Sequence, residues 1–119
     1  MNKAFLIGNI GKEPESREVG STTCCTFTLA TNKSYKDKDG NYQSQTQWHN
    51  IVAWRQTAEY ASKYLKKGNQ ILVEGEITYR SWEDKNGNSR ITTEIVADKI
   101  TLLEKKSSAN EPEEDDFPD

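Results

Sequence analysis

Residues 70–82 read QILVEGEITYRSW, and they alternate between apolar and polar side chains. The odd-numbered positions include Ile71, Val73 and Ile77, whereas most even-numbered positions are charged or polar. This alternation predicts a strand with one face on a hydrophobic core. Gly75 interrupts the apolar series and indicates a bend or a bulge.

Further strands are predicted on both sides of this one, at residues 3–10, 23–35, 44–54 and 89–103. The turn signals Asp39-Gly40 and Asn86-Gly87 join neighbouring strands into two long hairpins. The run 3–10 (KAFLIGNI) is mostly apolar, which predicts a strand buried on both faces.

Residues 57–67 (TAEYASKYLKK) change to a helical period, with Ala61 and Leu65 four positions apart. Thr57 is the expected N-cap and Gly68 the expected end of this helix. Five strands with one short helix between the third and the fourth are the plan of an OB-fold. This is an all-β, five-stranded Greek-key barrel that hosts many kinds of ligand.

Composition sets further bounds. Only 33% of the 119 residues are hydrophobic and 29% are charged, so the core must be small. No apolar run is long enough to span a membrane, and the N-terminus lacks the features of a secretory signal. A cytoplasmic location is therefore expected.

The formal net charge of −3 is divided unevenly along the chain. Residues 107–119 hold six acids and no base, which leaves sixteen bases and thirteen acids, a net charge of +3, in residues 1–106. The composition beyond about residue 105 cannot bury enough apolar surface to offset the entropy of ordering. We expect a basic domain at 1–105 and a disordered acidic tail at 106–119.

The sequence offers little for catalysis. It has one histidine, His49, and no nucleophile motif or phosphate-binding loop. Cys24 and Cys25 are adjacent, so on a strand they would point to opposite faces, and a zinc site needs about four ligands. These three residues are interpreted as structural, and the acidic tail as a solvated segment. We expect a protein that is not an enzyme and has neither cofactor nor metal.

The three tryptophans stand beside polar residues. Trp48 and Trp54 lie six apart in one predicted strand and so project from the same face. Trp82 falls on the charged parity of residues 70–82. The set predicts an exposed aromatic platform, but a tryptophan of a small barrel also often packs in the core. The residues alone leave both interpretations open.

An exposed platform suits single-stranded nucleic acid, because each base stacked on an aromatic ring is worth about 1–3 kcal/mol whatever its sequence. A duplex hides its base faces, so such a platform favours single strands. Basic side chains that would hold phosphates lie near each aromatic. They are Lys33, Lys36 and Lys38 around Tyr35, Arg55 beside Trp54, and Arg80, Lys85 and Arg90 around Trp82.

Four segments, in order along residues 1–104, resemble the bacterial single-stranded DNA-binding proteins. They are NKAFLIGNIGKEPE, FTLATNKSYKDKDG, TQWHNIVAW and YLKKGNQILVEGEITYRSWEDKNG. The resemblance implies an OB-fold, usually in a homotetramer, that coats single strands during replication, recombination and repair. It also implies association with the nucleoid.

The resemblance suggests roles by position. Trp48 and Trp82 match stacking tryptophans, Trp54 a position commonly held by Phe, and Tyr35 one commonly held by Trp. His49 matches a histidine of the subunit interface. Positions that are often basic and close to DNA are matched by Lys36, Lys38, Lys67, Arg80 and Arg90.

Some positions depart from the family pattern. Asn50 and Gln56 stand where Arg and Lys are common, which implies somewhat weaker contact with the DNA backbone. The family's tail usually ends in an acidic run, Pro and a terminal Phe that bind partner enzymes. Here that motif is represented by Glu113, Glu114, Asp115, Asp116, Phe117 and Pro118. The last residue is Asp119, so partner binding is either retained through Phe117, lost or specialised, and a phage or mobile-element origin stays open.

The sequence thus predicts a protein that binds single-stranded DNA without sequence preference, with a tail for replication and repair proteins. The main alternative is a protein-interaction adaptor on the same fold, similar to a primosome accessory protein. A cold-shock-like RNA-binding protein is a third interpretation.

Overall fold

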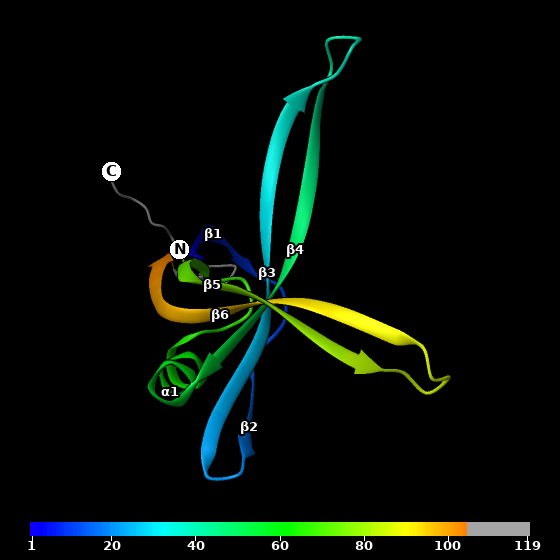
Figure 1. The fold of residues 1–119 in the computed structure, drawn as a ribbon. Helices are drawn as coiled ribbons and strands as arrows, with labels where there is room; N and C mark the ends of the chain where they lie inside the picture. Colours follow the sequence, from blue (N-terminus) through cyan, green and yellow to red (C-terminus); the bar gives the residue numbers. More distant parts are fainter. Residues whose placement is uncertain (105–119) are drawn as a thin grey trace.

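The computed structural model describes residues 1–104, which form six strands and one helix (Figure 1). In chain order the elements are β1 (Ala4–Ile10), β2 (Glu15–Val19), β3 (Thr22–Lys36), β4 (Tyr42–Trp54), α1 (Arg55–Tyr64), β5 (Gln70–Glu83) and β6 (Ser89–Glu104).

Five of the strands close into a barrel. The hydrogen-bonded order is β1-β5-β6-β4-β3-β2, and an additional pairing of β1 with β3 joins the ends of the five-strand series. All neighbours are antiparallel except β4 and β6, which pair in parallel at Ile51–Ile95 and Val52–Val96. This is a five-stranded OB-fold barrel with the helix between its third and fourth strands, so the predicted fold is confirmed.

The strand β2 is additional to the prediction. It pairs with β3 from Glu15 opposite Thr26 to Val19 opposite Thr22, and forms a hairpin that projects from the barrel (Figure 1). Its sequence, ESREV, is short and largely charged, so it shows no apolar alternation. Cross-strand pairing with the longer β3 makes it a strand.

The helix begins and ends earlier than the predicted 57–67. Its N-cap is Trp54 rather than Thr57, because β4 stays paired with β3 as far as Trp54 and the chain turns directly into α1. Leu65 follows the helix as its C-cap. Gly68, the expected end, instead lies in the connection to β5 with a φ of 89°.

The core fills the barrel and the space beneath α1. Its fully buried members include Leu29, Ile51, Ile71 and Val73, and α1 contributes Ala58 and Ala61. Cys25 belongs to this core, whereas Cys24 is buried but lies outside the core cluster. The two cysteines thus face opposite sides of β3, as predicted for neighbours on a strand.

The predicted irregularity at Gly75 is confirmed. The register between β5 and β6 shifts between Glu74 and Gly75. A Cβ at Gly75 would collide with the backbone carbonyl of Val96, so the two strands approach closely here. The bulge lets β5 curve from the barrel wall into a long hairpin.

The strand β1 is buried on one face only, contrary to the prediction. Gly8 and Ile10 point inward, but Phe5 is 62% exposed and Ile7 is 57% exposed. The apolar run therefore has a second face that the barrel of one chain leaves in solvent.

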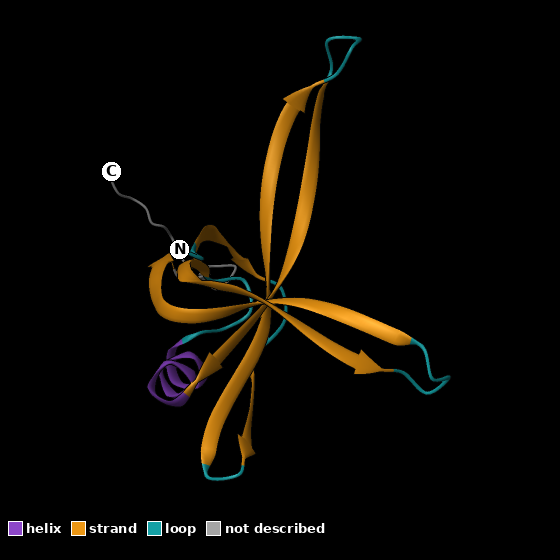
Figure 2. Ribbon diagram, viewed as in Figure 1, coloured by secondary structure: helices purple, strands orange, loops and turns teal. Residues whose placement is uncertain are grey.

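The outer halves of β3–β4 and β5–β6 leave the barrel as two long hairpin arms that diverge (Figure 2). Their tips are turns at residues 37–41 and 84–88, where Gly40 and Gly87 both adopt a φ of 82°. Both predicted turns are confirmed. Within residues 1–104, no helix is long and apolar enough to cross a membrane.

Candidate nucleic-acid interface

A shallow groove runs over the outer face of the barrel, on the side of the sheet away from the core. It consists of two adjoining hollows that share Arg17, Thr26, Val52, Arg80 and Glu94. Each of the five strands β2 to β6 contributes one of these residues, because alternate side chains of a strand project to the same face of the sheet. The groove thus spans the middle of the sheet.

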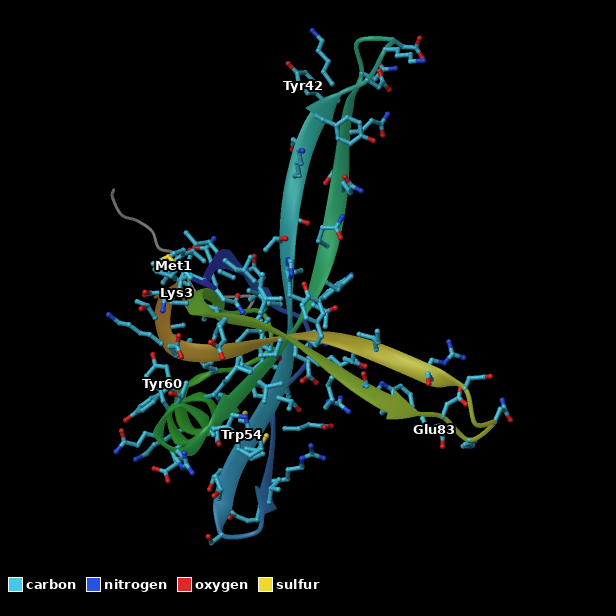
Figure 3. All side chains as sticks on the ribbon, in the orientation of Figure 1. Met1, Lys3, Tyr42, Trp54, Tyr60 and Glu83 are labelled. Atoms are coloured by element: carbon cyan, nitrogen blue, oxygen red, sulfur yellow. The ribbon has the colours of Figure 1, made fainter. Side chains whose placement is uncertain are left out.

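The three tryptophans project from this same outer face. Trp54 lines one end of the groove and is 38% exposed, and Figure 3 shows it beside the β2–β3 hairpin. Trp48 is 61% exposed and Trp82 is 43% exposed. None of them belongs to the core cluster, so the interpretation that they fill the core is wrong. Their stacking on bases stays a prediction.

Trp48 lies against Gly11, in the connection between β1 and β2. A Cβ on Gly11 would collide with the six-membered ring of Trp48. The absence of a side chain at this glycine therefore leaves room for the indole to lie close to the barrel.

Tyr35 is placed differently from the tryptophans. It is 46% exposed, but it projects from the other face of the β3–β4 arm than Trp48 does. Its cross-strand partner is Gln43, an odd-numbered position of β4, whereas Trp48 is an even-numbered one. Tyr42, at the end of that arm in Figure 3, shares the face of Trp48 and is 78% exposed. The Nζ of Lys36 lies 5.8 Å from its ring centroid, within cation–π range.

Two of the predicted phosphate-binding arginines are held by carboxylates. Arg80 forms an ion pair with Glu94 at 3.1 Å, and Arg90 forms one with Asp84 at 2.9 Å. Each arginine side chain is more than half exposed, so nitrogen atoms that do not take part in these pairs remain accessible.

The remaining predicted cations are distributed around the molecule. Lys38 lies in the β3–β4 tip, and Arg55 opens α1 directly after Trp54. Lys67 lies between α1 and β5, away from the residues that line the groove. The groove itself mixes charges, with Lys12, Arg17 and Arg80 facing Glu13, Glu15 and Glu94. The cations and the carboxylates that line the groove are therefore equal in number.

The two arm tips are built alike. Asp37 accepts hydrogen bonds from the backbone N–H of Asp39 and Asn41, and Asp84 does so from Asn86 and Asn88. The bond from Asn41, followed by that from Gln43, lowers the pKa of Asp37. The bond from Asn88, followed by that from Arg90, lowers the pKa of Asp84.

The family model for the single-strand binding protein family matches residues 1–103. The chain belongs to this family. It is 46% identical over 110 residues to "Single-stranded DNA-binding protein 1" of Chlorobaculum tepidum, which covers 91% of this chain and 68% of that protein. The protein of the same name from Xylella fastidiosa is 45% identical over 112 residues, or 92% of this chain and 82% of that one.

A solved structure gives the same result for the fold of this family member. The structure described as "Plasmodium falciparum SSB complex with ssDNA" superposes with a TM-score of 0.81 at 32% identity, over 87% of this chain and 96% of that chain. The resemblance found in the sequence is confirmed.

His49 of this single-strand binding family member lies at the base of the β3–β4 arm. It is partly buried, and its Nε2 lies 2.9 Å from Oγ1 of Thr31. This bond accounts for a structural role within one chain. A place in a subunit interface stays a prediction.

Sequence reasoning missed three residues of this face. Arg17 and Lys12 line the groove, and Tyr42 extends the aromatic surface. Arg17 was missed because the strand β2 was not predicted. Tyr42 was missed because it directly follows a turn and has no other aromatic residue next to it in the sequence. The cross-strand pairing of Lys36 with Tyr42 was the available signal, since the turn at Asp39-Gly40 sets that register. The predicted tail residues lie outside the part of the chain that the structure describes.

Proposed function

We propose that this chain binds single-stranded DNA without strong sequence preference and coats it during replication, recombination and repair. The observation that carries the proposal is the exposure of all three tryptophans on one outer face, beside a groove that crosses the sheet. Both relatives are named single-stranded DNA-binding proteins, and the similar structure is described as a complex with ssDNA.

In the proposed mode, bases stack on Trp48, Trp54 and Trp82, and phosphates pair with cations of the arms, of α1 and of the connection between α1 and β5. Stacking needs no sequence information, and phosphate pairing releases counterions. Tyr35 adds a stacking site on the other face of the β3–β4 arm. The single-stranded DNA reaches this site by passing over the edge of the arm. The proposed phosphate ligands are Lys36, Lys38, Arg55, Lys67, Arg80 and Arg90.

We propose residues 1–105 as the DNA-binding domain and 106–119 as a tail that recruits replication and repair proteins. The support is the charge division between a basic domain and an acidic end. A chain truncated before Ser107 should keep its DNA affinity and lose its partner proteins. A truncated chain that keeps every partner would remove the tail from the proposal.

We further propose a homo-oligomer, expected to be a homotetramer. The exposed Phe5 and Ile7 of β1 support it, because adjoining apolar side chains in solvent mark association surfaces. Leu72 of the neighbouring β5 pairs with Ile7 on the same side of the sheet and extends this surface.

Titration with poly(dT) at several salt concentrations, followed by tryptophan fluorescence, tests the function. We expect saturable quenching and an affinity that falls as salt rises. Trp54→Ala should weaken binding by about 1–3 kcal/mol without unfolding the domain. A folded protein that shows neither quenching nor DNA binding would contradict the proposal and favour the adaptor interpretation.

A further inference from the structure

Three side chains on the outer face of the β5–β6 arm donate hydrogen bonds across the arm. Each joins a long side chain to an acceptor on the opposite half of the hairpin. The pairs are Arg80 Nη2 to Glu94 Oε2 at 3.1 Å, Trp82 Nε1 to Thr92 Oγ1 at 2.8 Å, and Arg90 Nε to Asp84 Oδ2 at 2.9 Å. We call this set the diagonal ladder.

The diagonal ladder is regular. The backbone register places Arg80 opposite Thr92 and Trp82 opposite Arg90, so each bond reaches the residue two positions beyond the direct partner. Diagonal neighbours on one face are within reach of long side chains. Successive rungs follow at every second residue, which means that all three occupy the same face of the arm.

The proposed function assigns the three donors, Arg80, Trp82 and Arg90, to DNA binding. It assigns no role to the acceptors. We propose that Thr92 is a positioning residue, which fixes the Trp82 indole in its stacking orientation before DNA arrives. Glu94 and Asp84 hold the flanking arginines in the same way. This inference rests on the proposed function and deepens it.

The chemistry of the indole favours this role for Thr92. An indole has a single hydrogen-bond donor, which lies at the ring edge. When the indole N–H donates to Thr92, the hydrogen bond restricts the rotation of the Trp82 side chain and the tilt of its ring. Both faces of the ring remain available for stacking. Since Trp82 is 43% exposed, packing alone restrains it weakly. Restraint before binding reduces the entropy lost on binding.

The other arm provides a comparison. Its tip has the same backbone hydrogen bonds, but the side chain that reaches Asp37 is the neutral Gln43, at 3.0 Å. The hydrogen bonds that form such a tip therefore require neither an arginine at this position nor a hydrogen-bonded tryptophan in the arm. The β5–β6 arm combines that architecture with stacking and cationic donors, which points to preorganisation for a ligand.

Thr92→Val tests the inference, because it keeps the side-chain shape and removes the hydroxyl. We expect the affinity for a fluorescently labelled dT oligomer, measured by anisotropy, to fall roughly two- to tenfold. Thr92→Ser should restore binding. Thr93→Val is the matched control, since Thr93 is the adjacent exposed threonine on the other parity of β6. It should bind like the parent chain.

Two readouts separate positioning from a structural effect. In a Trp82→Phe background, which lacks the indole N–H, Thr92→Val should cause no further loss of affinity. In a Trp48→Phe/Trp54→Phe chain, Trp82 is the single tryptophan, and Thr92→Val should lower its steady-state fluorescence anisotropy. If Thr92→Val is not folded at the assay temperature, Thr92→Ala replaces it in each comparison.

The outcomes are distinct. Unchanged affinity in Thr92→Val, or an equal loss in the Trp82→Phe background, would overturn the inference. An equal loss in Thr93→Val would do the same, because it would indicate a general weakening of β6. A parent chain that binds no dT oligomer at all would instead contradict the proposed function.

Discussion

At the scale of single residues, Arg55 has the least favourable backbone of this interface. Its φ of 56° lies in the left-handed region, which is costly for a residue with a side chain. It is the first residue of α1 and directly follows Trp54, which lines one end of the groove. Strain of this kind tends to be retained where function requires it.

We therefore expect Arg55→Gly to raise the free energy of unfolding by about 1 kcal/mol and to weaken DNA binding. Stability would rise because glycine adopts positive φ freely, and affinity would fall because the guanidinium is lost. Urea unfolding and DNA titration measure the two effects. Gln56→Gly, one position further on in α1, should lower stability by about 1 kcal/mol. A loss of stability in Arg55→Gly would contradict this account.

Two glycines meet different obstacles when a methyl group is added. In Gly75→Ala the new Cβ meets the backbone of Val96, which cannot move freely, so unfolding should become easier by about 1–3 kcal/mol. In Gly11→Ala it meets the ring of Trp48, a side chain that can swing away, as well as the hydroxyl of Thr28. We expect Gly11→Ala to reduce DNA affinity more than stability.

Urea unfolding and dT titration of both variants provide the measurements. If Gly11→Ala lost as much stability as Gly75→Ala, with unchanged affinity per folded molecule, the assignment of Trp48 to the binding face would be wrong.

At the scale of elements, the two arms depend on their tip carboxylates. Asp84 has a lowered pKa because it accepts the N–H of Asn88 and the guanidinium of Arg90. A group with a lower pKa in the folded state binds fewer protons there than when unfolded. Its stabilising effect is therefore present above its unfolded pKa of about 3.9 and is lost as the pH falls through the folded value.

We expect the β5–β6 tip to loosen only under these acidic conditions and to be unaffected near neutral pH. Amide NMR signals of Asn86 and Asn88, followed during acid titration, would report it. Asp84→Asn should show the loosened signals already at neutral pH. A midpoint at or above the ordinary Asp value would contradict the hydrogen-bonding explanation.

At the scale of the whole molecule, the outward face of β1 connects the fold with assembly. Ile7 is exposed in one chain, so a charge there should leave the barrel folded. Ile7→Glu should nevertheless reduce the mass measured by light scattering from that of an oligomer towards that of one chain of 13.6 kDa. Ile91→Glu, at a 70% exposed position on the β5–β6 arm, is the control. A parent chain with the mass of one chain would remove the homotetramer.

The sequence by itself determined the strands with apolar alternation, both glycine turns, the Gly75 bulge and the family. These features depend on local periodicity and on conformations that few residues adopt. Only the tertiary structure decided that β2 exists, that α1 starts at Arg55, and that Trp82 is tied to Thr92. Each of these features depends on pairing between strands. The charged segment of β2, for example, is a strand because it pairs with β3. The exposure of Phe5 and Ile7 has the same origin, since an apolar run does not reveal how many of its faces the barrel covers.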